Sequence, residues 1–292
     1  MAKIKFWIEG ARPKTLIASI SPVIIGSAIS YSHGSFNILV LISALLTGIF
    51  LQIGTNLAND YFDTKKGSDT VERIGPRRIM QLGLVSDLSM KRAICISFLI
   101  ATCSCLYLII QGGPLVSYLL LLAVILGIGY TAGPLAIAYI GLGDFFVFFF
   151  FGCIATFMTT YLHTGKFLLE SFIAGIAPGA ISTAVLTINN LRDRTSDKKA
   201  SKNTLIVKFG NIFGKWEYTI MLLLAFLLPP IMSGAFHYNS RVILASSLSP
   251  FGLLLIRDVW LAKNPIDYIP LLPKTALLLA LYTSLFSLGL IR

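Results

Sequence analysis

Charged residues are scarce in this sequence of 292 residues. Only 13% of the residues are Asp, Glu, Lys or Arg, whereas 55% are hydrophobic and the mean hydropathy is +0.80. Soluble domains carry about 25% charged residues, so the composition excludes a water-soluble globule. Acidic residues are the scarcer kind, 13 against 24 basic residues, which leaves a net charge of +11.

Cysteine and histidine are scarce as well, with four and three residues. All four cysteines lie in apolar stretches, where Cys usually behaves as a small hydrophobic residue. Cys103 and Cys105 form a close pair, but no His and no second Cys pair accompanies them. The spacing therefore argues against a zinc or redox site.

Long apolar stretches account for most of the chain. Nine of them approach the length of about 20 mostly apolar residues that a membrane helix needs. They are residues 15–32, 38–59, 93–111, 114–131, 143–162, 168–190, 216–235, 241–259 and 274–291. We therefore expect an all-α polytopic membrane protein that forms a single membrane domain over residues 1–292.

The basic residues predict how these helices are oriented. With a cytoplasmic N-terminus, 21 of the 24 Lys and Arg residues fall on the cytoplasmic side, and only Lys166, Arg241 and Arg292 fall outside. An excess of Lys and Arg is typical of cytoplasmic loops. Because the excess lies in loops between membrane helices, we expect a lipid bilayer as partner and no nucleic acid. The first residues show no cleavable signal pattern, which together with the size favours the cytoplasmic (inner) membrane of a bacterium.

A short polar motif occurs twice, at the ends of the second and sixth stretches. Both copies read Asn-x-x-x-Asp, at Asn56 and Asp60 and again at Asn189 and Asp193, offset by 133 residues. Residues four apart share one face of a helix, so each copy projects an amide and a carboxylate together. Four stretches separate the copies, which places both at the same membrane surface. We therefore expect two parallel repeats, residues 1–165 and 166–292, with their motifs facing one ligand in the cytoplasmic half of the protein.

The chemistry of these motifs favours magnesium and phosphate. Carboxylate and amide oxygens without His or Cys are the ligands of Mg²⁺, which is usually held by one or two carboxylates and substrate phosphates. Lys and Arg from the neighbouring loops would bind a diphosphate, and the apolar helices would hold a hydrocarbon tail. The sequence thus predicts a lipid diphosphate as substrate. An Asp at a helix end near water also occurs for purely structural reasons, but two matched motifs make that explanation weak.

The motifs resemble those of a known family. Residues 56–69 read Asn-Leu-Ala-Asn-Asp-Tyr-Phe-Asp-Thr-Lys-Lys-Gly-Ser-Asp, similar to the first aspartate-rich motif of the UbiA superfamily of intramembrane prenyltransferases. Residues 190–205 read Asn-Leu-Arg-Asp-Arg-Thr-Ser-Asp-Lys-Lys-Ala-Ser-Lys-Asn-Thr-Leu, similar to its second. Residues 12–16, 75–78 and 130–135 match further family positions. The resemblance covers the chain from about residue 8 to its end and is strongest to the branch that acts on 1,4-dihydroxy-2-naphthoate in menaquinone synthesis.

The resemblance implies a fold and a reaction. The fold would be nine transmembrane helices around a central cavity, with the motifs at its cytoplasmic mouth. The reaction would be Mg²⁺-assisted ionisation of a polyprenyl diphosphate, attack by an electron-rich aromatic ring and, with the naphthoate, loss of CO₂. Some family members have a further Asp where this chain has Gly67, so the number of metal ligands stays open, and Asp69 could replace it.

The resemblance also implies roles for individual residues. We expect Asp60, Asp63, Asp193 and Asp197 to bind Mg²⁺ and to be catalytic. Asn56, Asn59 and Asn189 would ligate metal or orient the carboxylates, or would bond the carbonyl four residues earlier. Lys202 and Arg73 are expected near the diphosphate, and Arg12 near the carboxylate of the aromatic acceptor. Asp144, at the start of the fifth stretch, is expected to be a helix N-cap, with a role in the site as the alternative.

Other functions remain open from the sequence. The same metal site would serve another acceptor, such as 4-hydroxybenzoate. A transporter or lipid flippase is a function of a different class, but transporters place binding residues near the middle of the membrane, where this chain has almost no charge.

Overall fold

The structure is a computed structural model that describes residues 2–67, 75, 78–133 and 136–291. The described residues form helices and connecting turns, without a strand, which confirms the all-α prediction. The first half contains α1 (Ala2–Ala11), α2 (Pro13–Ser32), α3 (Ile38–Lys65), α4 (Asp87–Gly112), α5 (Pro114–Gly129), α6 (Ile137–Ile140), α7 (Gly143–Phe148), η1 (Phe149–Ile154) and α8 (Ala155–Thr164). The second contains α9 (Leu169–Ala174), α10 (Ile176–Lys199), α11 (Leu205–Phe209), α12 (Asn211–Ala235), η2 (Ser240–Leu248), α13 (Ser249–Leu261), η3 (Pro265–Tyr268) and α14 (Leu271–Leu290).

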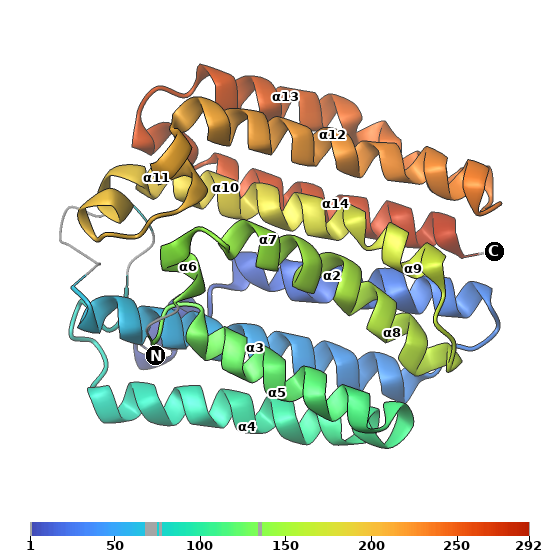
Figure 1. The fold of residues 1–292 in the computed structure, drawn as a ribbon, viewed down its shortest axis with the longest axis horizontal. Coiled ribbons are helices and arrows are strands. Elements are labelled where there is room, and N and C mark those ends of the chain that lie inside the picture. The colour runs from blue at the N-terminus through green and yellow to red at the C-terminus, as the bar shows by residue number, and fades with distance from the viewer. Residues whose placement is uncertain (1, 68–74, 76–77, 134–135, 292) are drawn as a thin grey trace.

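Eight helical segments of the described chain are long and apolar enough to cross a membrane. The remaining predicted stretch, residues 114–131, forms α5, which is apolar but has only 16 residues. The segments lie side by side as a bundle, with most helices along the same axis (Figure 1). The structure therefore has the architecture of a polytopic membrane protein.

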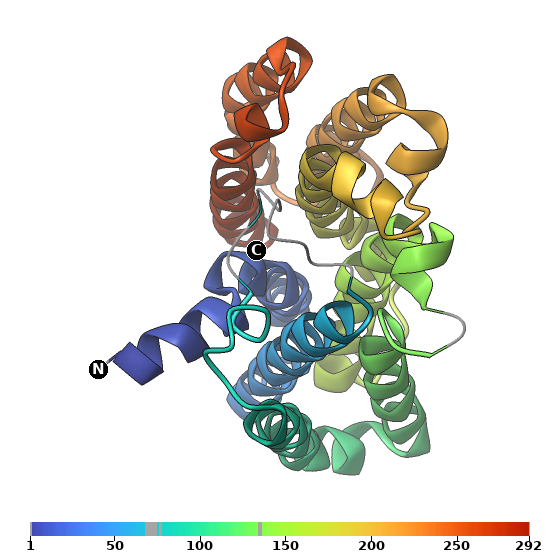
Figure 2. The same cartoon turned by 90° about the vertical axis from the view of Figure 1, so that its left-hand side faces the viewer.

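The two motif helices extend beyond the predicted apolar stretches. Helix α3 continues to Lys65 and α10 to Lys199, whereas the sequence predicted ends at residues 59 and 190. Hydropathy marks only the part of a helix that lies in hydrocarbon, and the polar turns that follow can stay helical. Both aspartate motifs therefore lie on continuous helix. The two helices finish at the same end of the bundle (Figure 1), which Figure 2 views end-on, with α1 projecting away from the bundle.

Close helix packing fixes the position of α10. It packs against α7, η1, α12 and α14, while α2 packs against α3, α8 and α14. A Cβ atom on Gly179 would lie 2.3 Å from the carbonyl oxygen of Phe148, and one on Gly152 would lie 2.5 Å from that of Gly175. Only glycine allows this approach of the two backbones, at the π-helical turn η1. The contact holds the first turn of α10 against the helical segment that begins with α7, at the polar cavity described below.

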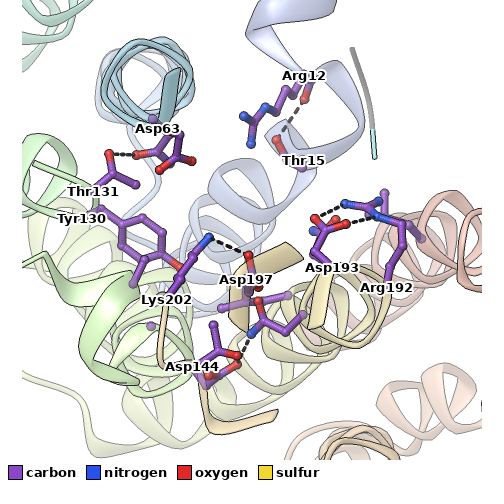
Figure 3. A pocket seen from close by; sticks show the side chains of 18 of the residues that line it. Arg12, Thr15, Asp63, Tyr130, Thr131, Asp144, Arg192, Asp193, Asp197 and Lys202 are labelled. Atoms are coloured by element: carbon purple, nitrogen blue, oxygen red, sulfur yellow. Dashed lines mark hydrogen bonds and ion pairs between the residues drawn. The ribbon is translucent and has the colours of Figure 1, made fainter. Parts of the chain in front are cut away.

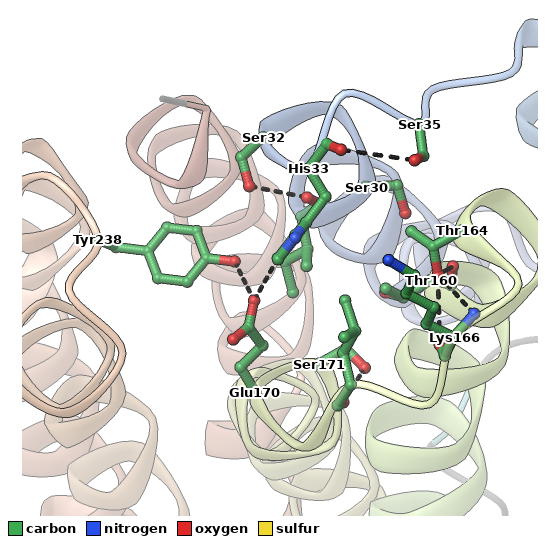
Figure 4. A network of polar contacts seen from close by, with 12 residues as sticks. Ser30, Ser32, His33, Ser35, Thr160, Thr164, Lys166, Glu170, Ser171 and Tyr238 are labelled. Carbon is green, nitrogen blue, oxygen red and sulfur yellow. Dashed lines mark hydrogen bonds and ion pairs between the residues drawn. The ribbon is translucent and has the colours of Figure 1, made fainter.

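The opposite end of the bundle carries a separate polar network (Figure 4). Glu170 at the start of α9 lies 2.6 Å from Nε2 of His33, just after α2, and accepts a hydrogen bond of 2.8 Å from the hydroxyl of Tyr238. His163 contacts the hydroxyl of Ser27 at 2.9 Å through Nε2. This network joins the α2–α3 connection to the segments before α10 and η2. It lies at the end of the bundle away from the aspartate motifs.

Candidate active site

A polar cavity of about 430 Å³ opens at the end of the bundle where α3 and α10 finish. The cavity is lined by residues of the α1–α2 junction, of α3 and α10, of the turns on either side of α6, and of the segment that follows α10 (Figure 3). Asp63, Asp193 and Asp197 all line it, although the two motifs are far apart in sequence. Both motif helices therefore bring carboxylates to one cavity, Asp63 from the first and Asp193 and Asp197 from the second.

Asp63 is the carboxylate that α3 presents to the cavity. It accepts a hydrogen bond of 2.9 Å from Arg78 Nη2 and one of 2.9 Å from the hydroxyl of Tyr139. The side chains of Arg78 and Asp63 are only 6% and 5% exposed, so this ion pair is buried. Asn59 also lines the cavity, and its Oδ1 accepts a hydrogen bond of 3.0 Å from Thr131.

Two residues of the first motif lie outside the cavity lining. Asp60 is 2% exposed and accepts a hydrogen bond of 3.1 Å from the backbone N–H of Ile79. Asn56 donates to the carbonyl oxygen of Ala11 at 2.9 Å and to the hydroxyl of Thr15 at 3.3 Å. In this arrangement Asn56 ties α3 to the α1–α2 junction, and Asp60 fixes the turn that carries Arg78.

The second motif presents its amide and both its carboxylates, Asn189, Asp193 and Asp197, to the cavity. Asp193 accepts two hydrogen bonds of 2.7 Å from Arg192, and Asp197 lies 3.8 Å from Lys202 Nζ. Asn189 lines the cavity and donates at 3.4 Å to the carbonyl of Val185, four residues earlier, the bond that the sequence suggested as its structural role. The carboxylates on this side are thus held close to basic groups.

The predicted substrate-binding cations have different positions. Arg12 and Lys202 both line the cavity. The backbone of Arg12 has φ 52°, a left-handed conformation that turns the chain between α1 and α2. Arg73 lies outside the described residues. Arg78, the last residue of the matching segment 75–78, is the cation paired with Asp63.

Sequence reasoning misassigned Asp144. The N-cap of α7 is Leu142, not Asp144, and the start of this helix has no side-chain cap. Asp144 instead lines the cavity, is 5% exposed and accepts a hydrogen bond of 3.4 Å from Asn190. The misassignment arose because a carboxylate near a helix start resembles a cap in sequence. Only its neighbours in space show that it faces the cavity.

A second, apolar cavity of about 270 Å³ lies among α2, α3, α4, α5, η1 and α8. Its walls are mainly aliphatic and aromatic, including Leu51, Leu120, Phe146 and Phe150. Tyr130, just after α5, lines both cavities. A polar site and an apolar site therefore meet at one side chain.

Comparisons with known proteins agree with this geometry. The family model described as UbiA prenyltransferase family matches residues 19–267. The chain belongs to the UbiA prenyltransferase family. A relative from Escherichia coli (strain K12), named 1,4-dihydroxy-2-naphthoate octaprenyltransferase, is 36% identical over 99% of this chain and 96% of its own.

Solved UbiA structures share the fold. The apo structure of a UbiA homologue from Aeropyrum pernix K1 superposes with a TM-score of 0.71 at 15% identity, covering 92% of this chain and 96% of that chain. A UbiA homologue from Archaeoglobus fulgidus bound to DMAPP and Mg²⁺ gives 0.63 at 15% identity, covering 96% and 99%. At these identities the likeness concerns the fold alone.

The donor set of this UbiA-family chain fits Mg²⁺ together with a diphosphate. The described residues contain no group of three or more His, Cys, Asp or Glu side chains close enough to enclose a metal by themselves. Mg²⁺ does not need such a cage, because it is commonly held by one or two carboxylates, water and substrate phosphates. Asp63, Asp193 and Asp197 supply hard oxygen donors on the walls of one cavity.

Proposed function

We propose that this chain transfers a polyprenyl group from a polyprenyl diphosphate to 1,4-dihydroxy-2-naphthoate, with Mg²⁺ and with loss of CO₂, giving demethylmenaquinol for menaquinone synthesis. The observation that carries the proposal is the meeting of the two cavities at Tyr130. A prenyl diphosphate has one charged end and one long apolar end, and the adjoining cavities match both. The name of the Escherichia coli relative supports the acceptor.

The diphosphate would bind among the basic and acidic side chains of the polar cavity. Arg78, Arg192 and Lys202 each lie beside a carboxylate. When a diphosphate enters, these cations can turn to its oxygens, while Asp63, Asp193 and Asp197 hold the Mg²⁺ that accompanies it. Bound Mg²⁺ would stabilise the charge that develops on the departing diphosphate. Asp60 would act indirectly, through the turn that positions Arg78.

The acceptor would occupy the same cavity, near the α1–α2 junction. Arg12 lines the wall opposite Asp144 in Figure 3 and would bind the carboxylate of the naphthoate. The prenyl chain would extend past Tyr130 into the apolar cavity. The reacting carbons of both substrates would then lie beside Tyr130.

The membrane arrangement belongs to the same proposal. We propose nine transmembrane helices with α5 as the shortest, a cytoplasmic N-terminus, and two parallel halves that each supply one motif. The cavity then faces the cytoplasm of a bacterial cell, on the side that carries 21 of the 24 basic residues. The aromatic acceptor, a soluble acid, would enter the cavity from the cytoplasm.

A product assay tests the proposal. Purified protein would receive Mg²⁺, a long-chain prenyl diphosphate and either 1,4-dihydroxy-2-naphthoate or 4-hydroxybenzoate, with products identified by mass. We expect a prenylated naphthalene without the carboxylate, and no product from Asp193→Ala protein that inserts normally. Prenylated 4-hydroxybenzoate as the sole product would reject the acceptor but keep the metal site. No product with either acceptor would reject the function.

A further inference from the structure

Asp144 differs from the aspartates of the two motifs. Asp63, Asp193 and Asp197 each lie within 4 Å of a basic side chain. Among the described residues no ion pair includes Asp144, and its hydrogen bond comes from the neutral amide of Asn190. It is nevertheless 5% exposed and lines the cavity. A buried carboxylate that forms no ion pair can bind a proton more readily than a paired one.

The position of Asp144 places it near the reacting centre. A Cβ atom on Gly143 would lie 2.8 Å from the hydroxyl of Tyr130, so the glycine lets this phenol lie against the start of α7. Tyr130 marks the boundary between the polar and the apolar cavity. Asp144 therefore lies where the head of a prenyl diphosphate joins its tail, on the wall opposite Arg12 (Figure 3).

The proposed reaction needs a group that holds a proton temporarily. When the ring carbon that bears the carboxylate attacks the allylic carbon, a C–C bond forms and the C–O bond to the diphosphate breaks. The neighbouring ring hydroxyl then becomes a ketone and loses its proton. Loss of CO₂ leaves the electron pair of the broken C–C bond on the ring, as an enolate, which takes a proton back. The proton balance of the turnover is therefore zero.

Resting on the proposed function, we propose that Asp144 accepts this hydroxyl proton and returns it after CO₂ leaves. Because the same proton is returned to the product, it does not have to pass to bulk water. A carboxyl group buried in the wall of the cavity can therefore hold it. Asn190 donates a hydrogen bond of 3.4 Å to Oδ1 of Asp144, so the other carboxylate oxygen would accept the proton. Asp63, Asp193 and Asp197 are unsuited to the task, because each lies beside a basic side chain and would hold Mg²⁺ in the proposed function.

The neighbours of Asp144 define its electrostatic surroundings. Lys202, from the segment after α10, acts on it as a positive charge, and Glu217 from α12 acts as a second acid. Tyr130 contributes a phenol from the end of α5. Glu217 bonds the hydroxyl of Thr187 at 3.1 Å and is absent from the cavity lining, so it does not reach the substrate itself. Glu9 lines the cavity from α1 and is the competing proton acceptor.

The test compares Asp144→Asn, Asp144→Glu, Asp144→Ala and Glu9→Gln in the product assay, with Glu170→Gln at the opposite end of the bundle as control. For Asp144→Asn we expect kcat to fall about 100-fold, the size usual for a lost general base, with KM for the prenyl diphosphate within about threefold. Asp144→Glu should restore part of kcat. Formate should restore part of kcat in Asp144→Ala but not in Asp144→Asn. In the wild type kcat should fall toward acid pH as Asp144 is protonated, and this fall should be absent in Asp144→Asn.

The possible results separate the outcomes. Unchanged kcat in Asp144→Asn, or an equal loss in Asp144→Asn and Asp144→Ala that neither Glu nor formate relieves, overturns the role of Asp144. A large loss in Glu9→Gln alone assigns the role to Glu9 instead. Wild-type protein that gives no prenylated naphthalene overturns the proposed function and this role together. Binding of a prenyl thiolodiphosphate to each variant checks that its cavity is folded.

Discussion

Asn56 and Asn189 occupy the same place in the two motifs but have different surroundings, which gives a sharp prediction. Asn56 is 3% exposed and makes three hydrogen bonds: to the carbonyl of Ala11 at 2.9 Å, to the hydroxyl of Thr15 at 3.3 Å and from Gln52 at 3.3 Å. Asn189 lines the cavity and makes one long bond, of 3.4 Å, within its own helix. The first side chain is therefore structural, and the second faces the cavity that would hold the proposed metal.

The magnitudes follow from these contacts. Hydrogen bonds contribute about 1 kcal/mol each, less for long ones, so Asn56→Ala should lower the free energy of unfolding by about 2 kcal/mol. The Mg²⁺ concentration for half-maximal activity should stay unchanged. Asn189→Ala should cost less than about 0.5 kcal/mol, because its bond is long and lies within the helix. Its half-saturating Mg²⁺ concentration should rise about tenfold, as for a lost outer ligand.

Denaturant titration in micelles and Mg²⁺ titration of the product assay measure both quantities on the same preparations. If excess Mg²⁺ restores Asn56→Ala, its amide contributes to the metal site after all. The assignment of Asn56 to the α1–α2 junction is then refuted. A large loss of stability in Asn189→Ala would refute the other half of the argument.

Three further predictions follow from the packing and the charges. Gly179→Ala should lower the free energy of unfolding by about 1–3 kcal/mol, because its Cβ would lie 2.3 Å from the carbonyl oxygen of Phe148. The control Gly234→Ala, whose Cβ would have no atom within 4 Å, should not destabilise the protein. Equal effects of the two changes would contradict the backbone contact. Arg78→Ala should lower the free energy of unfolding by about 3 kcal/mol, since it leaves Asp63 buried without its cation. The double variant with Asp63→Ala should lose less stability than the sum of the two single changes. Additive losses in the denaturant titration would exclude the coupling. The affinity for Mn²⁺, measured by electron paramagnetic resonance, should rise at least about tenfold when a prenyl thiolodiphosphate is present, because the binding of the two ligands is coupled. Tight binding of Mn²⁺ alone would show a preformed metal cage instead.

The sequence by itself determined the class of the protein and the location of its chemistry. Apolar stretches of membrane length and the scarcity of charge specify a helical membrane bundle, because hydrocarbon accepts only backbones whose polar groups are satisfied within the segment. The offset of 133 residues between the motifs, with four stretches between them, placed Asp63, Asp193 and Asp197 at one end of the bundle, and the structure brings them to one cavity.

Only the tertiary structure decided which side chains share that cavity. The sequence treats Asn56 and Asn189 as equivalents, but the fold places the carbonyl of Ala11 beside the first and open cavity beside the second. The fold also shows that Asp144 is a carboxylate of the cavity wall and not a helix cap, and that Arg78 pairs with Asp63. Local periodicity reports which face of a helix a residue occupies. The neighbour that meets that face comes from a distant segment, and its identity depends on how the helices pack.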